Sequence, residues 1–144
     1  MALQISKAAL KLPLSNPGQA GQSTERIFVH TLNADSGTDI IEMAGLPAYM
    51  VPTEVTVDTD NLAGVTTIQV GLVSGVFKEP DDARTLGSEF LAAAPSTAET
   101  STPLLTLADI EKSMEHRGIG VQLSQNEAAA ANKRIVLRVR YISM

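Results

Sequence analysis

The chain has 144 residues, of which 44% are hydrophobic and 19% are charged, so it is expected to form one globular domain, and global disorder is excluded. Its formal net charge of −5 disfavours nucleic acid as the main partner, because binding to phosphates requires a basic surface. The sequence contains no cysteine, which excludes disulfides and thiolate metal sites.

The first residues predict an extended arm rather than a secretion signal. Their apolar runs are interrupted by Lys7 and Lys11 and are too short for the core of a signal peptide. No apolar run in the sequence approaches the roughly 20 residues needed to span a bilayer. We therefore expect a protein made in the cytoplasm. Alternating apolar residues favour an arm or edge strand that ends at Pro13, with a helix over Ser6–Lys11 as the alternative.

A polar linker rich in Gly and Pro, Ser15–Thr24, separates this arm from the rest of the chain. We therefore divide the chain into an arm with its linker, residues 1–24, and a β domain, residues 25–144. Apolar side chains on a tether need a surface against which to be buried, either their own sheet edge or a partner's. The candidate partner-binding residues of the arm are Leu3, Ile5, Leu10, Leu12 and Leu14.

Period-two alternation predicts most of the strands that follow. Glu25–Asn33 and Thr38–Ala44 are the first two strands of the β domain. The segment Pro52–Val73 contains two alternating runs separated by Asp60–Gly64, whose residues favour a turn, so we expect a β-hairpin here. In the first strand, one face is expected to carry Arg26, Phe28, His30 and Leu32.

The second half of the chain mixes weaker helical signals with two more strands. Ser88–Ala94 is expected to form a short helical piece, and Leu104–Leu107 a short apolar strand. A helix is predicted over Thr106–His116 from the spacing of Leu107, Ile110 and Met114. Strands are predicted over Ile119–Ser124 and Lys133–Ser143, with a helical turn or loop between them at Asn126–Asn132. In the last strand, one face is expected to carry Ile135, Leu137, Val139 and Tyr141.

About seven or eight strands with at most two short helices predict an all-β, mainly antiparallel sandwich or barrel. The opposite face of the last strand carries a basic stripe, Arg134, Arg138 and Arg140. This stripe could mark a contact with an acidic partner or a neighbouring subunit, or it could be an ordinary solvent-facing side of a sheet.

The sequence contains no constellation typical of an enzyme or a metal site. His30 and His116 have no second His nearby, so a zinc site would have to be built mainly from carboxylates. Asp58–Asn61 superficially resembles the start of a calcium loop but lacks the distal glutamate. Phosphate-binding and nucleophile motifs are absent from the sequence. We expect no catalytic activity, no cofactor and no metal.

Several segments resemble small virion proteins of tailed phages that are often encoded beside the major capsid protein. They are Leu46–Pro47, Val55–Asp58, Leu62–Gly64, Val70–Leu72, Ser88–Ala92 and Lys133–Tyr141. The resemblance implies a jelly-roll-like head decoration (cement) protein without enzymatic activity.

Such a protein binds the outer capsid as an oligomer and bridges neighbouring capsomers. The implied partners are the major capsid protein and further copies of the chain, as a dimer or trimer, without nucleic acid or membrane. The implied location is the capsid surface of the virion, after synthesis in the host cytoplasm. A tail, neck or baseplate component and a carbohydrate-binding sandwich module are the alternatives.

Overall fold

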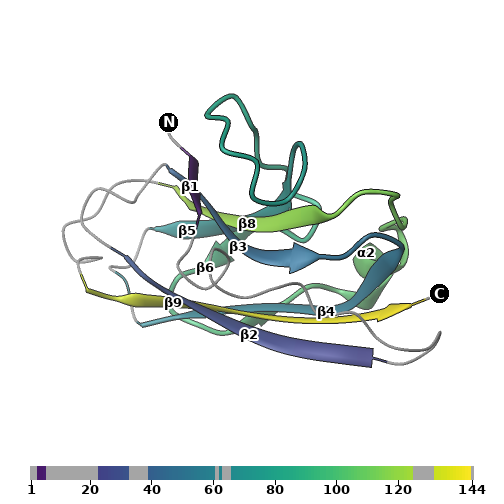
Figure 1. The fold of residues 1–144 in the computed structure, drawn as a ribbon. Coiled ribbons are helices and arrows are strands. Elements are labelled where there is room, and N and C mark those ends of the chain that lie inside the picture. Colours follow the sequence, from purple (N-terminus) through teal and green to yellow (C-terminus); the bar gives the residue numbers. More distant parts are fainter. Residues whose placement is uncertain are drawn as a thin grey trace.

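The computed structural model describes residues 3–5, 23–32, 39–60, 62, 66–124 and 132–143. These residues form two β-sheets that lie face to face, as Figure 1 shows, with one short helix at one end. The arm residues Leu10, Leu12 and Leu14, and Asn126 to Ala131 of the predicted loop, lie outside the described residues. The prediction of an all-β, mainly antiparallel sandwich is confirmed.

The first sheet contains five strands in the order β1-β3-β8-β5-β6. Only the edge pair β1–β3 is parallel, and the other pairs are antiparallel. In sheet order the strands span Leu3–Ile5 (β1), Ile40–Leu46 (β3), Arg117–Leu123 (β8), Thr67–Val73 (β5) and Leu91–Pro95 (β6).

The second sheet contains four antiparallel strands in the order β2-β9-β4-β7. In sheet order they span Ser23–Thr31 (β2), Arg134–Ser143 (β9), Met50–Thr59 (β4) and Thr100–Ser101 (β7). Strands β2 and β9 pair without a register shift from Ser23↔Ile142 to Thr31↔Arg134. This long regular ladder fixes which side chains of β9 face the core and which face outward.

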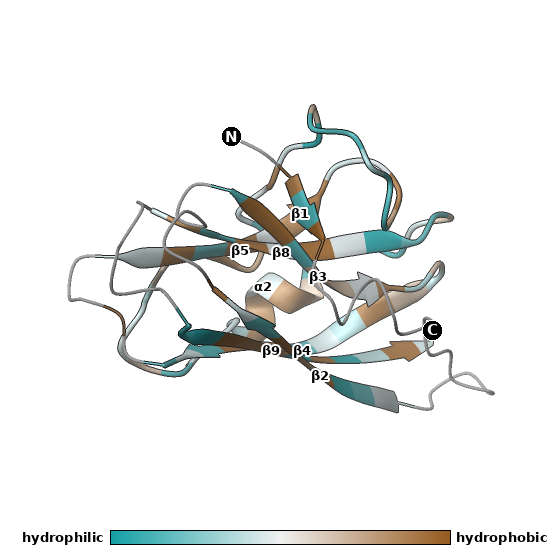
Figure 2. Cartoon of the chain, turned by 60° about the vertical axis from the view of Figure 1, so that its left-hand side comes forward, coloured by the Kyte–Doolittle hydropathy of each residue, from teal (hydrophilic) through white to brown (hydrophobic). Residues whose placement is uncertain are grey.

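The core between the sheets is built from the alternating residues that the sequence indicates. In β9, Ile135, Leu137, Val139 and Tyr141 are buried, as predicted. In β2, Phe28 is buried while Ile27 and Val29 are exposed, so the two faces are separated as predicted, and the face that carries Phe28 meets the core. Figure 2 shows hydrophobic and hydrophilic residues alternating along the strands. Because few aromatics are available, Val, Ile, Leu and Met fill most of the core.

The hairpin predicted over Pro52–Val73 is wrong. Strand β4 pairs with β9 and β7, whereas β5 pairs with β8 and β6 in the other sheet. The connection therefore crosses from one sheet to the other, and Leu62 within it is buried. Alternation reveals that a strand has one buried face, but it does not identify the neighbouring strand.

The helical predictions are wrong in position. Ser88–Ala94 contributes to strand β6, and the expected strand at Leu104–Leu107 is helical. The helix α2 spans Leu104–Ala108, so the predicted helix over Thr106–His116 ends after its first residues. Met114, which was expected in that helix with Leu107 and Ile110, lies beyond its end and is 77% exposed. No helix in the described part of the chain is long and apolar enough to cross a membrane.

A buried ion pair connects the first sheet to the long β5–β6 connection, which projects beyond that sheet in Figure 1. The side chains of Glu42 in β3 and Arg84 in the connection are 0% and 3% exposed. Arg84 Nη2 lies 2.5 Å from Glu42 Oε2, and Nη1 lies 3.2 Å from Oε1. The backbone N–H of Lys78 donates a further hydrogen bond to Glu42 Oε1, at 2.9 Å.

The rest of the guanidinium binds the connection itself. Arg84 Nη1 donates to the carbonyl of Glu79 at 2.7 Å, and Nε donates to the carbonyl of Ser74 at 2.5 Å. One arginine therefore binds two positions of the connection, Ser74 at its start and Glu79 five residues before Arg84. We call Glu42, Arg84 and these backbone partners the Glu42 clamp.

We predict that Glu42→Gln destabilises the fold by about 3–5 kcal/mol, because it leaves a buried guanidinium without its counter-charge. The free energy of unfolding from urea denaturation measures the loss. Arg134→Gln, which removes an arginine whose side chain is 63% exposed, is the control and should cost much less. A loss for Glu42→Gln as small as that expected for Arg134→Gln would show that the Glu42 clamp does not stabilise the fold.

Candidate contact surfaces

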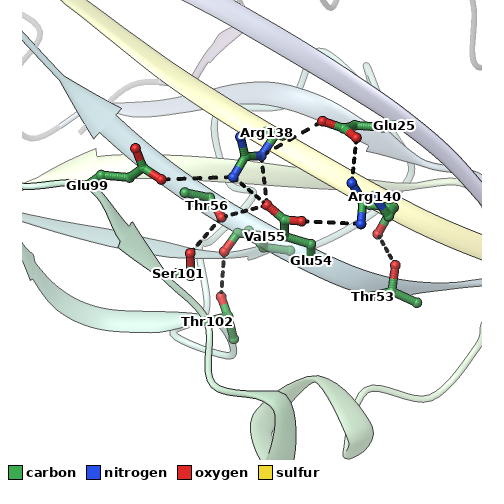
Figure 3. Close-up of polar contacts among 10 residues, drawn as sticks. All are labelled: Glu25, Thr53, Glu54, Val55, Thr56, Glu99, Ser101, Thr102, Arg138 and Arg140. Carbon is green, nitrogen blue, oxygen red and sulfur yellow. Dashed lines mark hydrogen bonds and ion pairs between the residues drawn. The ribbon is translucent and has the colours of Figure 1, made fainter.

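The outward face of the second sheet carries a network of charged side chains drawn from three strands and one loop. Figure 3 shows Arg138 and Arg140 of β9 between Glu25 of β2 and Glu54 of β4, with Glu99 at the side. We call these five residues the outer charge network. The strand register produces it, because Arg140 lies opposite Glu25 on one side and Glu54 on the other.

The distances within the outer charge network are those of direct ion pairs. Arg138 Nη2 lies 2.6 Å from Glu54 Oε1, and Arg140 Nη2 lies 2.7 Å from Glu25 Oε2. The hydrogen bond from Arg140 is the main reason why the pKa of Glu25 is lowered from its ordinary value. Longer contacts of 3.7–3.9 Å join Arg138 to Glu25 and Glu99, and Arg140 to Glu54. The network binds β2, β9 and β4 together across their solvent-facing side.

Arg134 forms a separate pair with Asp60 at the end of the same sheet. Its Nε and Nη2 each lie 3.0 Å from a carboxylate oxygen of Asp60, and its backbone N–H donates to Oδ2 at 2.8 Å. These hydrogen bonds lower the pKa of Asp60 from 3.8 to about 2. Asp60 in turn raises the pKa of Arg134.

The three arginines of the predicted basic stripe therefore do lie on one face, but their charges are paired with carboxylates of the same chain. Arg134, Arg138 and Arg140 share the outward face of β9, and each contacts at least one carboxylate. These partners could not be predicted from the local sequence pattern, because they lie 74, 84 and 115 residues away along the chain. An acidic partner would have to compete with them for the three arginines.

The described part of the arm lies along the chain's own sheet edge. Leu3 and Ile5 of β1 are partly buried and pair with Ile40 and Glu42 of β3. Gln4 Nε2 also donates to Asp39 Oδ2 at 2.6 Å. Leu3 and Ile5 are therefore placed against the edge of the chain's own sheet, and not against that of a partner. A partner contact by Leu10, Leu12 and Leu14 stays a prediction.

An apolar groove lies beside α2, where that helix meets the start of β4 and the end of β9. Its volume is about 870 Å³. The apolar side chains that line it are Val51, Pro52, Leu104, Leu107, Ile110 and Ile142. Glu111 and Lys112 also line it, and we call this surface the α2 groove.

The residues around the α2 groove are unusually exposed for their type. Leu104, Leu105 and Met114 are 79%, 83% and 77% exposed. Large apolar patches on a protein surface often mark interaction sites. This surface does not follow from the sequence pattern, which predicts Leu104 in a strand and Met114 in a helix with Leu107 and Ile110. The apolar pair that directly follows Pro103 in a polar stretch was the available signal.

The described residues contain no group of three or more His, Cys, Asp and Glu that could hold a metal ion. His116 Nδ1 accepts a hydrogen bond from the backbone N–H of Ala48 at 3.0 Å. In the segment that superficially resembles a calcium loop, the Asp58 carboxylate accepts from the backbone N–H of Thr59, while Asp60 binds Arg134. These two carboxylates therefore serve different local contacts.

We predict that Arg134→Gln moves the titration midpoint of the Asp60 carboxyl from about 2 towards 3.8, because the largest cause of the lowered pKa is the hydrogen bond from Arg134. Since the folded pKa is below the unfolded one, the pair stabilises the fold above about pH 4, and this contribution is lost as the pH falls towards 2. NMR titration of the Asp60 side chain measures the midpoint. Arg138→Gln, on the same face, is the control and should leave it low.

The comparisons with known proteins identify relatives among solved structures. No family model and no curated protein matches the chain. A chain in the structure "Capsid of Ralstonia phage GP4" is 33% identical and superposes with a TM-score of 0.88, and the match covers 99% of each chain.

A chain in the structure "Acidic stable capsid structure of Helicobacter pylori bacteriophage KHP30" matches with a TM-score of 0.56 over 86% of this chain and 90% of that one. At 14% identity, this second likeness shows a shared fold alone. The first likeness is close enough, and extends far enough along both chains, to show common family membership. The protein therefore belongs to the same family as the matched chain of the Ralstonia phage GP4 capsid, a family of phage capsid proteins.

Proposed function

We propose that this protein is a decoration, or cement, protein that binds the outer surface of a phage capsid and stabilises the shell by bridging neighbouring capsomers. The observation that carries the proposal is the full-length likeness to a chain of the Ralstonia phage GP4 capsid. Membership of this family supports a non-enzymatic, structural role in the virion. The segments that resemble phage decoration proteins, from Leu46–Pro47 to the last strand, support the more specific role.

A small domain that lies across a joint between capsomers stabilises the assembled shell through mass action. It binds the assembled state, in which both halves of its site are present, more tightly than separated subunits. A specific protein interface buries about 800 Å² per partner, and that area would have to be exposed before the joint opens. The sandwich suits this role because its long paired strands make it a rigid body.

The proposed contacts with the major capsid protein are the arm and the basic stripe. In the arm, Leu10, Leu12 and Leu14 alternate as in a segment that adds a strand to a neighbouring sheet edge. Leu3 and Ile5 anchor that segment to β3. In the stripe, Arg134, Arg138 and Arg140 are exposed enough to exchange their carboxylate partners for those of the shell. We further propose that the protein acts as a dimer or trimer.

A carbohydrate-binding module receives less support from the described surface. Such modules stack sugars on exposed aromatic rings. Among the large hydrophobic residues that are exposed in the described part of the chain, Tyr49 is the only aromatic one. The likeness to a chain of a phage capsid favours a place in the head over a tail, neck or baseplate component.

We predict that the protein binds assembled shells of its phage but not free capsid subunits, because only a shell presents both sides of a joint. Shells that lack the protein are mixed with it and sedimented to measure binding, and then heated to measure their rupture temperature. Added protein should raise that temperature. Equal binding to free subunits, or binding to tails alone, would contradict a bridging role.

We predict that replacing Leu10, Leu12 and Leu14 together by Ser weakens shell binding about tenfold or more, because an apolar anchor is lost. These positions lie outside β1, so the pairing of Leu3 and Ile5 is retained, and circular dichroism confirms the fold. Exposed Val76→Ser, in the β5–β6 connection, is the control. Unchanged binding by the triple variant would remove the arm from the proposed contacts.

A further inference from the structure

Exposed apolar residues gather at one end of the sandwich. Among the described residues, seven large hydrophobic side chains are exposed, and four of them, Tyr49, Leu104, Leu105 and Met114, belong to this end. Figure 1 shows α2 beside the turn that joins β3 to β4. That turn carries Tyr49, whose backbone N–H donates to the carbonyl of Ser113 at 2.7 Å, so the segment with Met114 also lies here. The α2 groove opens at the same end.

The α2 groove has both a hollow and a protrusion made by the same short helix. Leu107 is buried and forms part of the floor, and Ile110 packs partly against the core. Leu104, one turn earlier, lines the groove and yet is 79% exposed, and Leu105 beside it is 83% exposed. The same surface therefore has two protruding apolar side chains, Leu104 and Leu105, which we call the knob, next to an apolar hollow.

The charges at this groove differ from those of the outer charge network. Glu111 and Lys112 are both exposed, and in the described part of the chain neither forms an ion pair or a side-chain hydrogen bond. The arginines of β9, in contrast, are all paired within the chain. The groove thus carries one free charge of each sign, at adjacent positions.

We propose that the α2 groove is the contact surface between two copies of this chain, with Leu104 and Leu105 of each copy packed against the groove of the other. In a two-fold interface, if residue i of one copy contacts residue j of the other, then j also contacts i. Adjacent opposite charges fit this rule, because Glu111 of one copy can face Lys112 of the second copy in both halves of the contact. The same surface then supplies the knob, the hollow and both charges.

A second copy accounts for this surface better than a foreign partner does. A foreign partner would need its own knob, hollow and opposite charges, whereas a second copy already has each of them. The local charge of the Glu111–Lys112 pair is zero, so two acidic chains with a net charge of −5 can meet here without like charges in contact. This self-contact would form in solution and gives a surface to the dimer proposed above, but it does not depend on the proposed shell binding.

Charge reversal at Glu111 and Lys112 distinguishes a contact between two copies from a contact with a different protein. Analytical ultracentrifugation of the full chain should show concentration-dependent association. E111K and K112E should each weaken association about tenfold, because each brings like charges together. The double variant E111K/K112E should restore it, since exchanging both signs on both copies recreates the opposite pairs.

Two further variants test the apolar part. Leu104→Ser and Leu105→Ser should each weaken association about tenfold, while Val76→Ser, an exposed apolar residue of the β5–β6 connection, should leave it unchanged. Because all three side chains are exposed, their replacement should not disturb the core. Thermal melts should confirm that the variants fold. A chain that stays monomeric at every concentration would overturn the proposal.

Other outcomes also decide against it. Association that none of these variants changes would move the contact elsewhere, and failure of the double variant to restore association would exclude the Glu111–Lys112 pairing. If the variants instead lose shell binding without changing association, the α2 groove contacts the shell. The variant with Leu10, Leu12 and Leu14 replaced by Ser tests the proposed function separately. It should lose shell binding while its self-association stays normal.

Discussion

The buried carboxylate of Glu42 constrains more of this fold than any other single group. It lies in the middle of β3 with a fully buried side chain, next to the register shift between Glu42 and Ala44. A buried carboxylate is unfavourable unless its oxygens are paired, and here Arg84 and the Lys78 backbone pair them. The strand opposite must also leave it room, because a Cβ at Gly118 would overlap the Glu42 side chain. Three distant parts of the chain therefore depend on one carboxylate.

The two sheets use charge in opposite ways. In the first sheet, a single buried ion pair anchors the long β5–β6 connection, so its loss leaves an uncompensated charge in the interior. In the second sheet, the charges lie outside and form the outer charge network, where water screens each pair. The outer charge network can therefore exchange partners at little cost to the fold, whereas the Glu42 clamp cannot. Only the second arrangement is compatible with a surface that meets another protein.

The sequence predicts individual strands of this fold well and their partners poorly. The division of β9 and of β2 into two faces follows from alternation alone. Alternation does not show which face of β2 meets the core, because Arg26 and His30 share the face of the buried Phe28, while Ile27 and Val29 are exposed. The pairing of β4 with β9 depends on contacts between distant segments, so the local turn residues at Asp60 suggested a hairpin that does not form. The same limitation concealed the carboxylates beside the basic stripe. The spacing of Leu107, Ile110 and Met114 suggested one helix over Thr106–His116, but α2 ends at Ala108 and Met114 is exposed.

The molecule has two surfaces that suit different contacts. One is the exposed apolar surface at α2, and the other is the face of β9 with its paired charges. Apolar burial favours lasting association, since it contributes roughly in proportion to area and salt does not screen it. Exposed ion pairs contribute little affinity but steer and orient an approaching surface. A self-contact through the α2 groove would lie next to the outer charge network, because Ile142 of the groove and Arg140 of the network share the outward face of β9. In the proposed role, an oligomer formed in this way would present several charged faces together, so that weak single contacts with a shell act jointly.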